Sequence, residues 1–409
     1  MPLLTDIATL ATCRAAGDQD DVHPIPDAAL AWEDGAVRWA GPEAELPAEY
    51  AAWKRERAGG RLVVPGLVDC HTHLAFGGWR GDEFAERLAG RSYLDIARAG
   101  GGIAGTVRHT RAASEAELAE RAAGFLDAMR TLGVTTVEAK SGYGLSVEDE
   151  LKQLRVVRRL QETQPSRLVP TFLGAHTVPP EYRDRRDAYL RLLTDELLPQ
   201  VAEAGLARFC DAFVEDTAFT VEEARRVFDA AREHGLRAKL HADQLSDTGG
   251  AALAAQVGAV SADHLEYVSA EGIEAMARAG VVAVSLPLAT LYLHVEPMPA
   301  RRLLEAGVPV AVATDFNPGS APSYHLPLAM LLACTLQRMT PAEALKGATL
   351  VAAQALDLDA EIGSLEPGKR ADFAVIDAPD VNHWLYHFRP NACVRTVIGG
   401  ETVWEAPDA

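Results

Sequence analysis

The sequence feature that most limits the fold of this chain is an apolar run that ends in two histidines, at residues 62–73. Its residues are Leu-Val-Val-Pro-Gly-Leu-Val-Asp-Cys-His-Thr-His, a composition typical of a buried strand. Side chains alternate faces along a strand, so His71 and His73 are predicted to point to the same side. Two imidazoles on one side of a strand end provide half of a metal site, whereas a chance pair on a solvated strand is the alternative.

Apolar strand patterns alternate with helical stretches between residues 62 and 357. Helices are predicted over 116–132, 147–161 and 221–234, the first of them with Ser114 as its N-cap. The predicted strands are 67–73, 135–140, 168–176, 209–215, 238–241, 259–264, 281–286 and 310–315. This pattern predicts an α/β fold, a (β/α)8 or TIM barrel, with the chemistry at the carboxyl ends of the strands.

Both ends of the chain are rich in strands rather than helices. A turn at Gly35 separates apolar runs near the amino end, and Gly399 and Gly400 mark a turn near the carboxyl end. We therefore predict two units. Residues 1–61 and 358–409 form a small composite β domain, and residues 62–357 form the barrel.

Several other predicted strands also end in residues that can carry chemistry. These are His176, His241, His264 and Asp315. Any one of them alone is more often structural, but together they predict a shared site at one rim of the barrel. The predicted metal ligands are His71, His73, His241 and Asp315. Three neutral imidazoles and a carboxylate suit one divalent ion, Zn²⁺ or Fe²⁺.

A metal of this kind predicts a hydrolytic reaction. It lowers the pKa of bound water from about 15.7 towards about 7 and so supplies hydroxide at neutral pH. Asp315 and His264 are the candidate catalytic groups that take the proton and pass it to a leaving nitrogen. Gln244 follows His241 by three residues, and an amide does not exchange a proton at neutral pH. We assign Gln244 to orienting the substrate and leave open a part in proton transfer.

The composition limits the partners of the chain. Lys and Arg total 39 against 58 Asp and Glu, a net charge of −19, which disfavours binding to nucleic acid or to an anionic membrane. The 5 cysteines contain no Cys-x-x-Cys pair, which favours reduced thiols in the cytoplasm. We see no signal peptide, and no apolar run approaches the roughly 18 residues of a membrane span.

Longer strings resemble one family, the imidazolonepropionases, which are amidohydrolases of histidine degradation. The strings are residues 76–80, 99–103, 137–145, 172–182, 241–244 and 314–320. The resemblance implies that the small domain is a composite β-sandwich and that the protein is a homodimer. It also implies a small-molecule substrate, 4-imidazolone-5-propanoate, whose cyclic amide is hydrolysed to N-formimino-L-glutamate.

The resemblance also implies a set of substrate-binding residues: Arg80, Tyr93, Tyr143, His176, Gln244, Asn317, Gly319 and Ser320. Arg80 offers a planar donor fork for the propionate, and Tyr93 with the glycines at 100–102 forms a lid. Each residue also has a structural alternative. Arg80 can be a solvated surface arginine, residues 100–102 a surface loop, Tyr143 a tyrosine over the barrel rim, His176 a structural histidine, and residues 317–320 a simple turn.

The sequence leaves alternatives in metal number and in function. Binuclear relatives carry a lysine at the end of the fourth strand, but predicted strand 209–215 has none, so one ion is expected. Another mononuclear amidohydrolase, such as a nucleobase deaminase, is the nearest rival, and Gln244 and Arg80 weigh against it. A barrel that serves only as a scaffold would have lost its metal ligands, and all of the predicted ligands are present here.

Overall fold

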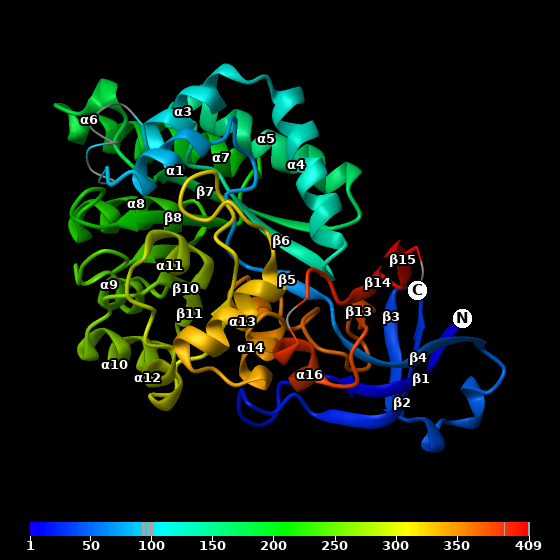
Figure 1. The fold of residues 1–409 in the computed structure, drawn as a ribbon. Helices are drawn as coiled ribbons and strands as arrows, with labels where there is room; N and C mark the ends of the chain where they lie inside the picture. The colour runs from blue at the N-terminus through cyan, green and yellow to red at the C-terminus, as the bar shows by residue number, and fades with distance from the viewer. Residues whose placement is uncertain (92–94, 96–100, 388, 408–409) are drawn as a thin grey trace.

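The chain folds around two sheets that lie at opposite ends of the molecule (Figure 1). The computed structural model describes residues 1–91, 95, 101–387 and 389–407. Tyr93 and Gly100, which were predicted to belong to a lid, lie outside the described residues. None of the helices in the described ranges is long and apolar enough to cross a membrane.

The larger unit is a barrel of parallel strands. Its 8 strands follow the order β12-β11-β10-β9-β8-β7-β6-β5. They are β5 (Leu67–Asp69), β6 (Val134–Lys140), β7 (Arg167–Ala175), β8 (Phe209–Val214), β9 (Arg237–Ala242), β10 (Ser261–His264), β11 (Val282–Ser285) and β12 (Val310–Val312). Past β5 and β12, Thr72 and Phe316 form a parallel bridge, and the His73 N–H donates to the Phe316 carbonyl at 2.9 Å. The predicted TIM barrel is confirmed.

Helices cover the outside of this barrel (Figure 1). They are α1 (Gly81–Leu88), α3 (Ile103–Ala112), α4 (Glu115–Arg130), α5 (Val147–Thr163), α6 (Arg186–Arg191), α7 (Leu198–Glu203), α8 (Val221–Glu233), α9 (Gly250–Val257), α10 (Ala270–Ala279), α11 (Pro287–Leu293), α12 (Ala300–Glu305), α13 (Leu326–Gln337), α14 (Pro341–Gly347), α15 (Leu350–Gln354) and α16 (Val381–Tyr386). Ser114 caps α4 as predicted, because its hydroxyl accepts the Glu117 N–H while the Glu117 carboxylate accepts the Ser114 N–H. A π-helix, Leu192–Leu197, joins α6 to α7. Single 3₁₀ turns span Glu43–Glu45, Ala48–Tyr50 and Pro180–Tyr182.

The second sheet has 7 strands from both ends of the chain, as predicted, in the order β15-β14-β13-β4-β1-β2-β3. They are β1 (Pro2–Ala11), β2 (Pro24–Glu33), β3 (Ala36–Pro42), β4 (Lys54–Pro65), β13 (Phe373–Ile376), β14 (Cys393–Ile398) and β15 (Glu401–Glu405). The sheet curls over its own apolar face, since Trp32 on β2 meets Phe373 on β13 with ring centroids 5.1 Å apart. The division of the chain at residues 61/62 and 357/358 stays a prediction, and β4 runs across the first boundary to Pro65.

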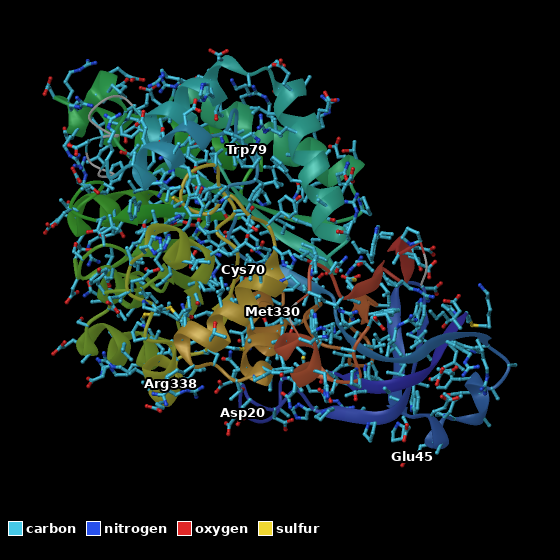
Figure 2. The ribbon with its side chains drawn as sticks, in the orientation of Figure 1. Asp20, Glu45, Cys70, Trp79, Met330 and Arg338 are labelled. Carbon is cyan, nitrogen blue, oxygen red and sulfur yellow. The ribbon has the colours of Figure 1, made fainter. Side chains whose placement is uncertain are left out.

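The two sheets are joined directly by the chain and by a loop. Only Gly66 separates β4 of the curled sheet from β5 of the barrel. The Gln19 side chain donates to the Val310 carbonyl at 2.7 Å, and the Lys346 ammonium donates to the Asp18 and Asp21 carbonyls at 2.9 and 3.0 Å. Figure 2 shows Cys70 within the barrel and Glu45 at the far end of the curled sheet. His71 and His73, the buried histidines that follow Cys70, therefore lie in the barrel and not in the curled sheet.

Candidate active site

The histidine pair lies at the carboxyl-end rim of the barrel, just past a strand. The prediction that one strand covers 67–73 is wrong at its end, because β5 stops at Asp69 and His71 and His73 follow it. Their segment is fixed by Asp69, whose carboxylate accepts the Thr314 N–H at 3.1 Å and the Thr314 hydroxyl at 2.6 Å. Burial raises the pKa of Asp69 to about 7. The strand end thus ties the histidine segment to the segment that carries Asp315.

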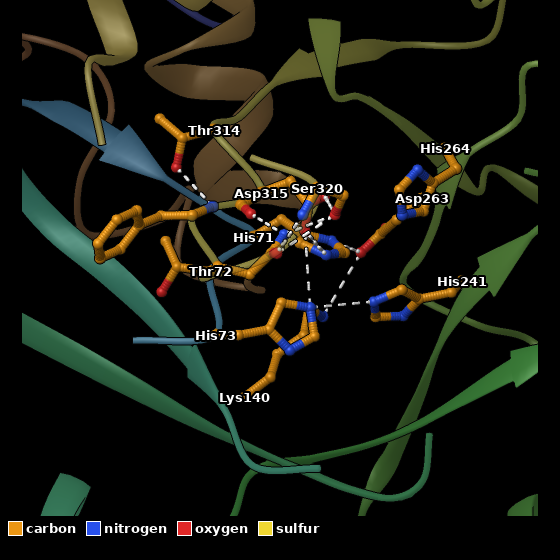
Figure 3. Close-up of polar contacts among 12 residues, drawn as sticks. His71, Thr72, His73, Lys140, His241, Asp263, His264, Thr314, Asp315 and Ser320 are labelled. Atoms are coloured by element: carbon orange, nitrogen blue, oxygen red, sulfur yellow. Dashed lines mark hydrogen bonds and ion pairs between the residues drawn. The ribbon is translucent and has the colours of Figure 1, made fainter. Parts of the chain in front are cut away.

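The side chains of the predicted metal ligands converge (Figure 3). Asp315 Oδ1 lies 3.3 Å from His71 Nε2 and 3.6 Å from His73 Nε2. The Nε2 atoms of His73 and His241 lie 3.4 Å apart. Two ligand atoms of a tetrahedral zinc ion, each about 2.0–2.1 Å from the metal, are separated by roughly 3.3–3.4 Å. Each of these three separations is close to that value. His71, His73 and Asp315 form one group of ligand atoms within 4.8 Å of one another, and His71, His241 and His264 form a second.

The hydrogen bonds of two ligands direct a lone pair to the same centre. His71 Nδ1 lies 2.6 Å from Asp263 Oδ2, and His241 Nδ1 lies 3.1 Å from Asp211 Oδ2. A carboxylate only accepts hydrogen bonds, so each Nδ1 carries the proton and each Nε2 keeps its lone pair. Metal-binding histidines use this arrangement, in which the second nitrogen donates to a carboxylate.

Unsatisfied buried atoms also mark this centre as a place for an ion. His71 Nε2 is buried and has no hydrogen-bond partner within the described parts of the chain. Burial lowers the pKa of both His71 and His73 well below the usual range of histidine, so both rings are neutral. Neutral imidazoles with a free lone pair, together with a carboxylate, are the donor set of zinc and iron sites.

Asp315 combines a strained backbone with a perturbed carboxyl group. Its φ is 56°, a left-handed value that is uncommon for a residue other than glycine. Burial raises the pKa of Asp315 to about 6, although His264 and His241 oppose this rise. A carboxyl group that titrates near neutral pH is suited to move a proton.

His264 lies beside this cluster and is almost fully buried. Its ring centroid is 5.4 Å from that of His241 and 5.7 Å from that of His71. Glu266 Oε2 lies 3.8 Å from His264 Nδ1, too far for a hydrogen bond, and attracts the ring by charge. Burial alone would lower the pKa of His264, but Glu266, Asp315 and Asp263 outweigh it and raise that pKa. The His264 ring can therefore hold a proton.

Arg80 lies against the loop that follows Asp315. A Cβ atom at Gly319 would overlap the Arg80 guanidinium, so only glycine allows this approach. Arg80 also pairs with Glu83, with Nη2 2.7 Å from Oε2, and the other Glu83 oxygen accepts the Gly102 N–H at 2.9 Å. The structure therefore brings Arg80 and Gly319 together, and it neutralises part of the Arg80 charge.

The loop of residues 317–320 is built by its own asparagine. The Asn317 Oδ1 accepts the N–H groups of Gly319 and Ser320, both at 2.8 Å, and its Nδ2 donates to the Asp315 carbonyl at 2.6 Å. The Ser320 hydroxyl lies 3.5 Å from Asp315 Oδ2. The Asn317 side chain thus stabilises a turn, which was the alternative to substrate binding at this position. Ser320 is half-buried and lies beside Asp315.

Tyr143 and His176 lie on the other side of His73. Their ring centroids are 5.5 Å and 5.1 Å from that of His73, and the His176 ring stacks on it. His176 Nδ1 lies 2.9 Å from the Gly142 carbonyl, which fixes the proton on Nδ1. Burial, and then His241, lower the pKa of His176 to about 3. His176 is therefore a neutral ring whose Nε2 accepts a hydrogen bond.

The remaining predicted residue and the unpredicted ones lie around this cluster. Gln244 is half-buried on the loop after β9. The sequence-based reasoning missed the carboxylates that contact the histidines: Asp211, Asp263 and Glu266. The available signal was charge at alternate positions of otherwise apolar strands, as at Glu138 and Lys140 on β6.

The chain is similar to known proteins along most of its length. Residues 62–403 match the amidohydrolase family. An imidazolonepropionase of Cupriavidus pinatubonensis is 51% identical over 95% of this chain and 92% of its own length. That of Geobacillus thermodenitrificans is 47% identical over 97% of this chain and 96% of its own.

A solved structure supports the fold alone. An adenosine deaminase from Xanthomonas campestris with bound zinc covers 98% of this chain and 92% of its own, with a TM-score of 0.72 and 19% identity. The sequence relatives are far more similar to the chain than this structure is. The chain therefore belongs to the amidohydrolase family, and within it to the imidazolonepropionases.

Proposed function

We propose that this protein hydrolyses the cyclic amide of 4-imidazolone-5-propanoate to N-formimino-L-glutamate. The observation that carries the proposal is the 51% identity to an imidazolonepropionase over 95% of the chain. In the reaction, water adds to the ring carbonyl carbon, the ring C–N bond breaks, and the nitrogen leaves with a proton. The convergence of a metal-type donor set with groups that hold protons supports this reaction.

The metal proposed for this site is a single Zn²⁺ or Fe²⁺ ion. The proposed ligands are His71, His73, His241 and Asp315, whose spacing supports one ion. When bound, such an ion supplies an activated water at neutral pH and polarises a carbonyl oxygen. The adenosine deaminase with bound zinc shares the fold, which favours zinc as the first ion to test.

Proton transfer is assigned to Asp315 and His264. Both side chains lie at the histidine cluster, where Asp315 can accept a proton from the attacking water and His264 can donate one to the leaving nitrogen. Gln244 is assigned to holding the substrate by hydrogen bonds. The carboxylate of Glu266 favours the protonated form of His264.

The substrate is proposed to lie between Arg80 and the rings of Tyr143 and His176. Arg80 would hold the propionate, because a guanidinium offers parallel donors to a carboxylate. His176 accepts at Nε2, so it suits an N–H of the imidazolone ring better than the propionate. Gly319 and Ser320 border the Arg80 end, and Tyr93 remains a predicted part of a lid. The homodimer and the cytoplasmic location also remain predictions.

The test is the Arg80→Ala variant, assayed by loss of the ultraviolet absorbance of imidazolonepropionate. We expect kcat/KM to fall roughly 10–150-fold, the value of a charged hydrogen bond of about 1.5–3 kcal/mol. Arg87→Ala is the matched control, since Arg87 lies in the last turn of α1, the helix that begins just after Arg80, and stacks over Tyr292 instead. Unchanged kinetics of Arg80→Ala would mean that the propionate is held elsewhere. Ammonia release from purines or pyrimidines would favour a deaminase instead.

A further inference from the structure

A group of charged side chains lies inside the barrel beneath the histidines. It consists of Glu138 and Lys140 on β6, Asp211 on β8, Lys239 on β9 and Asp263 on β10, all 0% exposed. Fully buried charges are costly unless each is paired. None of them is needed to hold the proposed metal or substrate directly. Their arrangement therefore needs an explanation of its own.

Lys140 is the centre of this group. Its ammonium lies 2.7 Å from Asp211 Oδ2, 3.0 Å from Glu138 Oε2 and 3.5 Å from Asp263 Oδ2, the last of these drawn as a dashed line in Figure 3. Burial alone would lower the pKa of Lys140, but Asp211, Glu138 and Asp263 together raise it. The side chain is thus a buried cation that contacts several carboxylates at once.

Two of those carboxylates continue to the proposed metal ligands. Asp263 Oδ2 lies 2.6 Å from His71 Nδ1, and the Asp211 carboxylate lies 3.1 Å from His241 Nδ1. Asp263 and Asp211 come from β10 and β8, which lie on either side of β9 in the sheet. Asp263 also accepts the Ser261 hydroxyl at 2.6 Å and Asp211 the His241 N–H at 3.2 Å, but Lys140 is the cation that offsets the repulsion between the two carboxylates. One ammonium therefore fixes two aspartates, and each aspartate fixes one imidazole.

We propose that Lys140 is a positioning residue that aligns His71 and His241 for the metal through Asp263 and Asp211. This inference rests on the proposed metal site. The Lys140 ammonium would hold His71 and His241, which lie far apart in the sequence, in the orientation that the metal requires. Partners in this outer position typically change metal affinity or activity by about 10–100-fold when they are removed.

Lys239 provides a matched control within the same group. It carries the same charge and is equally buried. Its ammonium contacts Glu138 at 3.1 Å and the carbonyls of Cys70 and Ala355 at 3.3 and 3.2 Å. Within the described chain these partners do not include the aspartates that bind the histidines. Lys239→Met therefore removes a buried charge from the network but leaves the Lys140 ammonium in contact with Asp211 and Asp263.

The experiment compares zinc affinity of the full-length wild type, Lys140→Met and Lys239→Met by competition with a chromogenic chelator. Circular dichroism of the metal-free proteins reports whether each is folded. We expect Lys140→Met to bind zinc about 10–100-fold more weakly and Lys239→Met within about threefold of wild type. The visible spectrum of the Co²⁺ form should change in Lys140→Met only, since that spectrum reports ligand geometry.

The outcomes separate this inference from the proposed function. Equal losses in the two methionine variants, or an unchanged Lys140→Met, would overturn the role of Lys140 while the metal site stands. A wild type that binds no zinc or iron would overturn the proposed metal function itself. If Lys140→Met does not fold, Lys140→Gln and Lys239→Gln repeat the comparison with side chains that still donate hydrogen bonds. The same difference in affinity is expected from that pair, and its absence would refute the proposal.

Discussion

The interior of the barrel and the interior of the curled sheet differ in the charge that they bury. Beneath the active-site histidines the barrel encloses charged residues such as Lys140, Asp211 and Asp263 at 0% exposure. The curled sheet encloses a cluster of apolar residues that includes Leu30, Val63 and Phe373, and the charged Asp372 next to β13 is 5% exposed. Apolar burial stabilises without geometric demands, whereas buried charges stabilise only when each finds its partner. The comparison teaches that stability and preorganisation are supplied by different parts of the molecule.

Left-handed backbone conformations occur in both regions. Asp243, His264 and Asp315 adopt left-handed φ values of 49°, 79° and 56° where the barrel strands end. Such residues cost of order 1–3 kcal/mol each and persist where the surroundings hold them in place. In the curled sheet, left-handed residues occur at the hairpin turn between β2 and β3, as at Asp34 and Gly35, and within strands, as at Asp6 on β1 and Asp27 on β2. Left-handed residues of the barrel rim differ from these in lying beside the histidine cluster.

The largest effect is expected from a ligand of the barrel site. His241→Asn should abolish metal binding and lower kcat/KM by about 10³-fold or more, since a catalytic metal contributes several kcal/mol. The metal content after dialysis and the absorbance assay measure this. His234→Asn is the control, because His234 is exposed at the end of α8 and should behave as wild type. A metal-replete, active His241→Asn would contradict the proposed ligand set.

The second effect belongs to the curled sheet and should touch stability alone. Phe373→Ala removes a fully buried ring and should lower the free energy of unfolding by about 3–5 kcal/mol. Zinc affinity of the folded variant should change less than about threefold, because the ring is far from the ligands. Tyr386→Ala, at a side chain that is 87% exposed, is the control for thermal unfolding. A large loss of zinc affinity in Phe373→Ala would show that the two regions are coupled.

A smaller effect follows from the titration of Asp315. Burial raises its pKa to about 6, so the metal-free carboxyl group is protonated below that pH. A metal must displace this proton, and affinity should therefore fall about tenfold per pH unit below about pH 6 and stay nearly constant above it. His71 and His73 add no such step, since burial keeps their pKa values low. Zinc titrations from about pH 5 to 7.5 test this, and a flat profile below pH 6 would contradict it.

The smallest effect is expected at the surface of the barrel. Arg278 and Glu274 form an ion pair on α10 at 3.4 Å, with both side chains 71% exposed. Arg278→Ala should change the free energy of unfolding by no more than about 0.5 kcal/mol, and less in high salt. Urea unfolding measures this difference. If Arg278→Ala lowered the free energy of unfolding as much as Phe373→Ala does, the expectation that buried contacts contribute more stability than exposed ones would be wrong.

The sequence allowed the barrel strands and the convergent ligands to be predicted because both depend on local patterns. The helix predicted over 221–234 and α8 (Val221–Glu233) agree closely, since polarity alternates there with helical period. The strand ends were less accurate, as at β5 and β12, where Asp315 follows the last paired residue by three positions. Pairing with neighbouring strands, rather than composition, decides where a strand stops.

The partners of the ligands were beyond reach of the sequence for a physical reason. Lys140, Asp211 and Asp263 lie on separate strands, and only the register of the sheet brings their side chains together. The pairing of Arg80 with Glu83 was readable from a spacing of three residues on α1. The contact of Arg80 with Gly319 was not, since it joins loops far apart in the chain.

The position of β13 between β14 and β4 has a consequence for synthesis of the protein. β4 pairs with β13, and the two strands are separated in the chain by the entire barrel. While the barrel is being synthesised, the edge of β4 that pairs with β13 has no partner strand. The apolar residues Leu62 to Val64 on this edge can then pair with other nascent chains. The sheet formed by both ends of the chain therefore cannot be completed until β13 has been synthesised. A delay in this step would leave the edge of β4 exposed and favour aggregation.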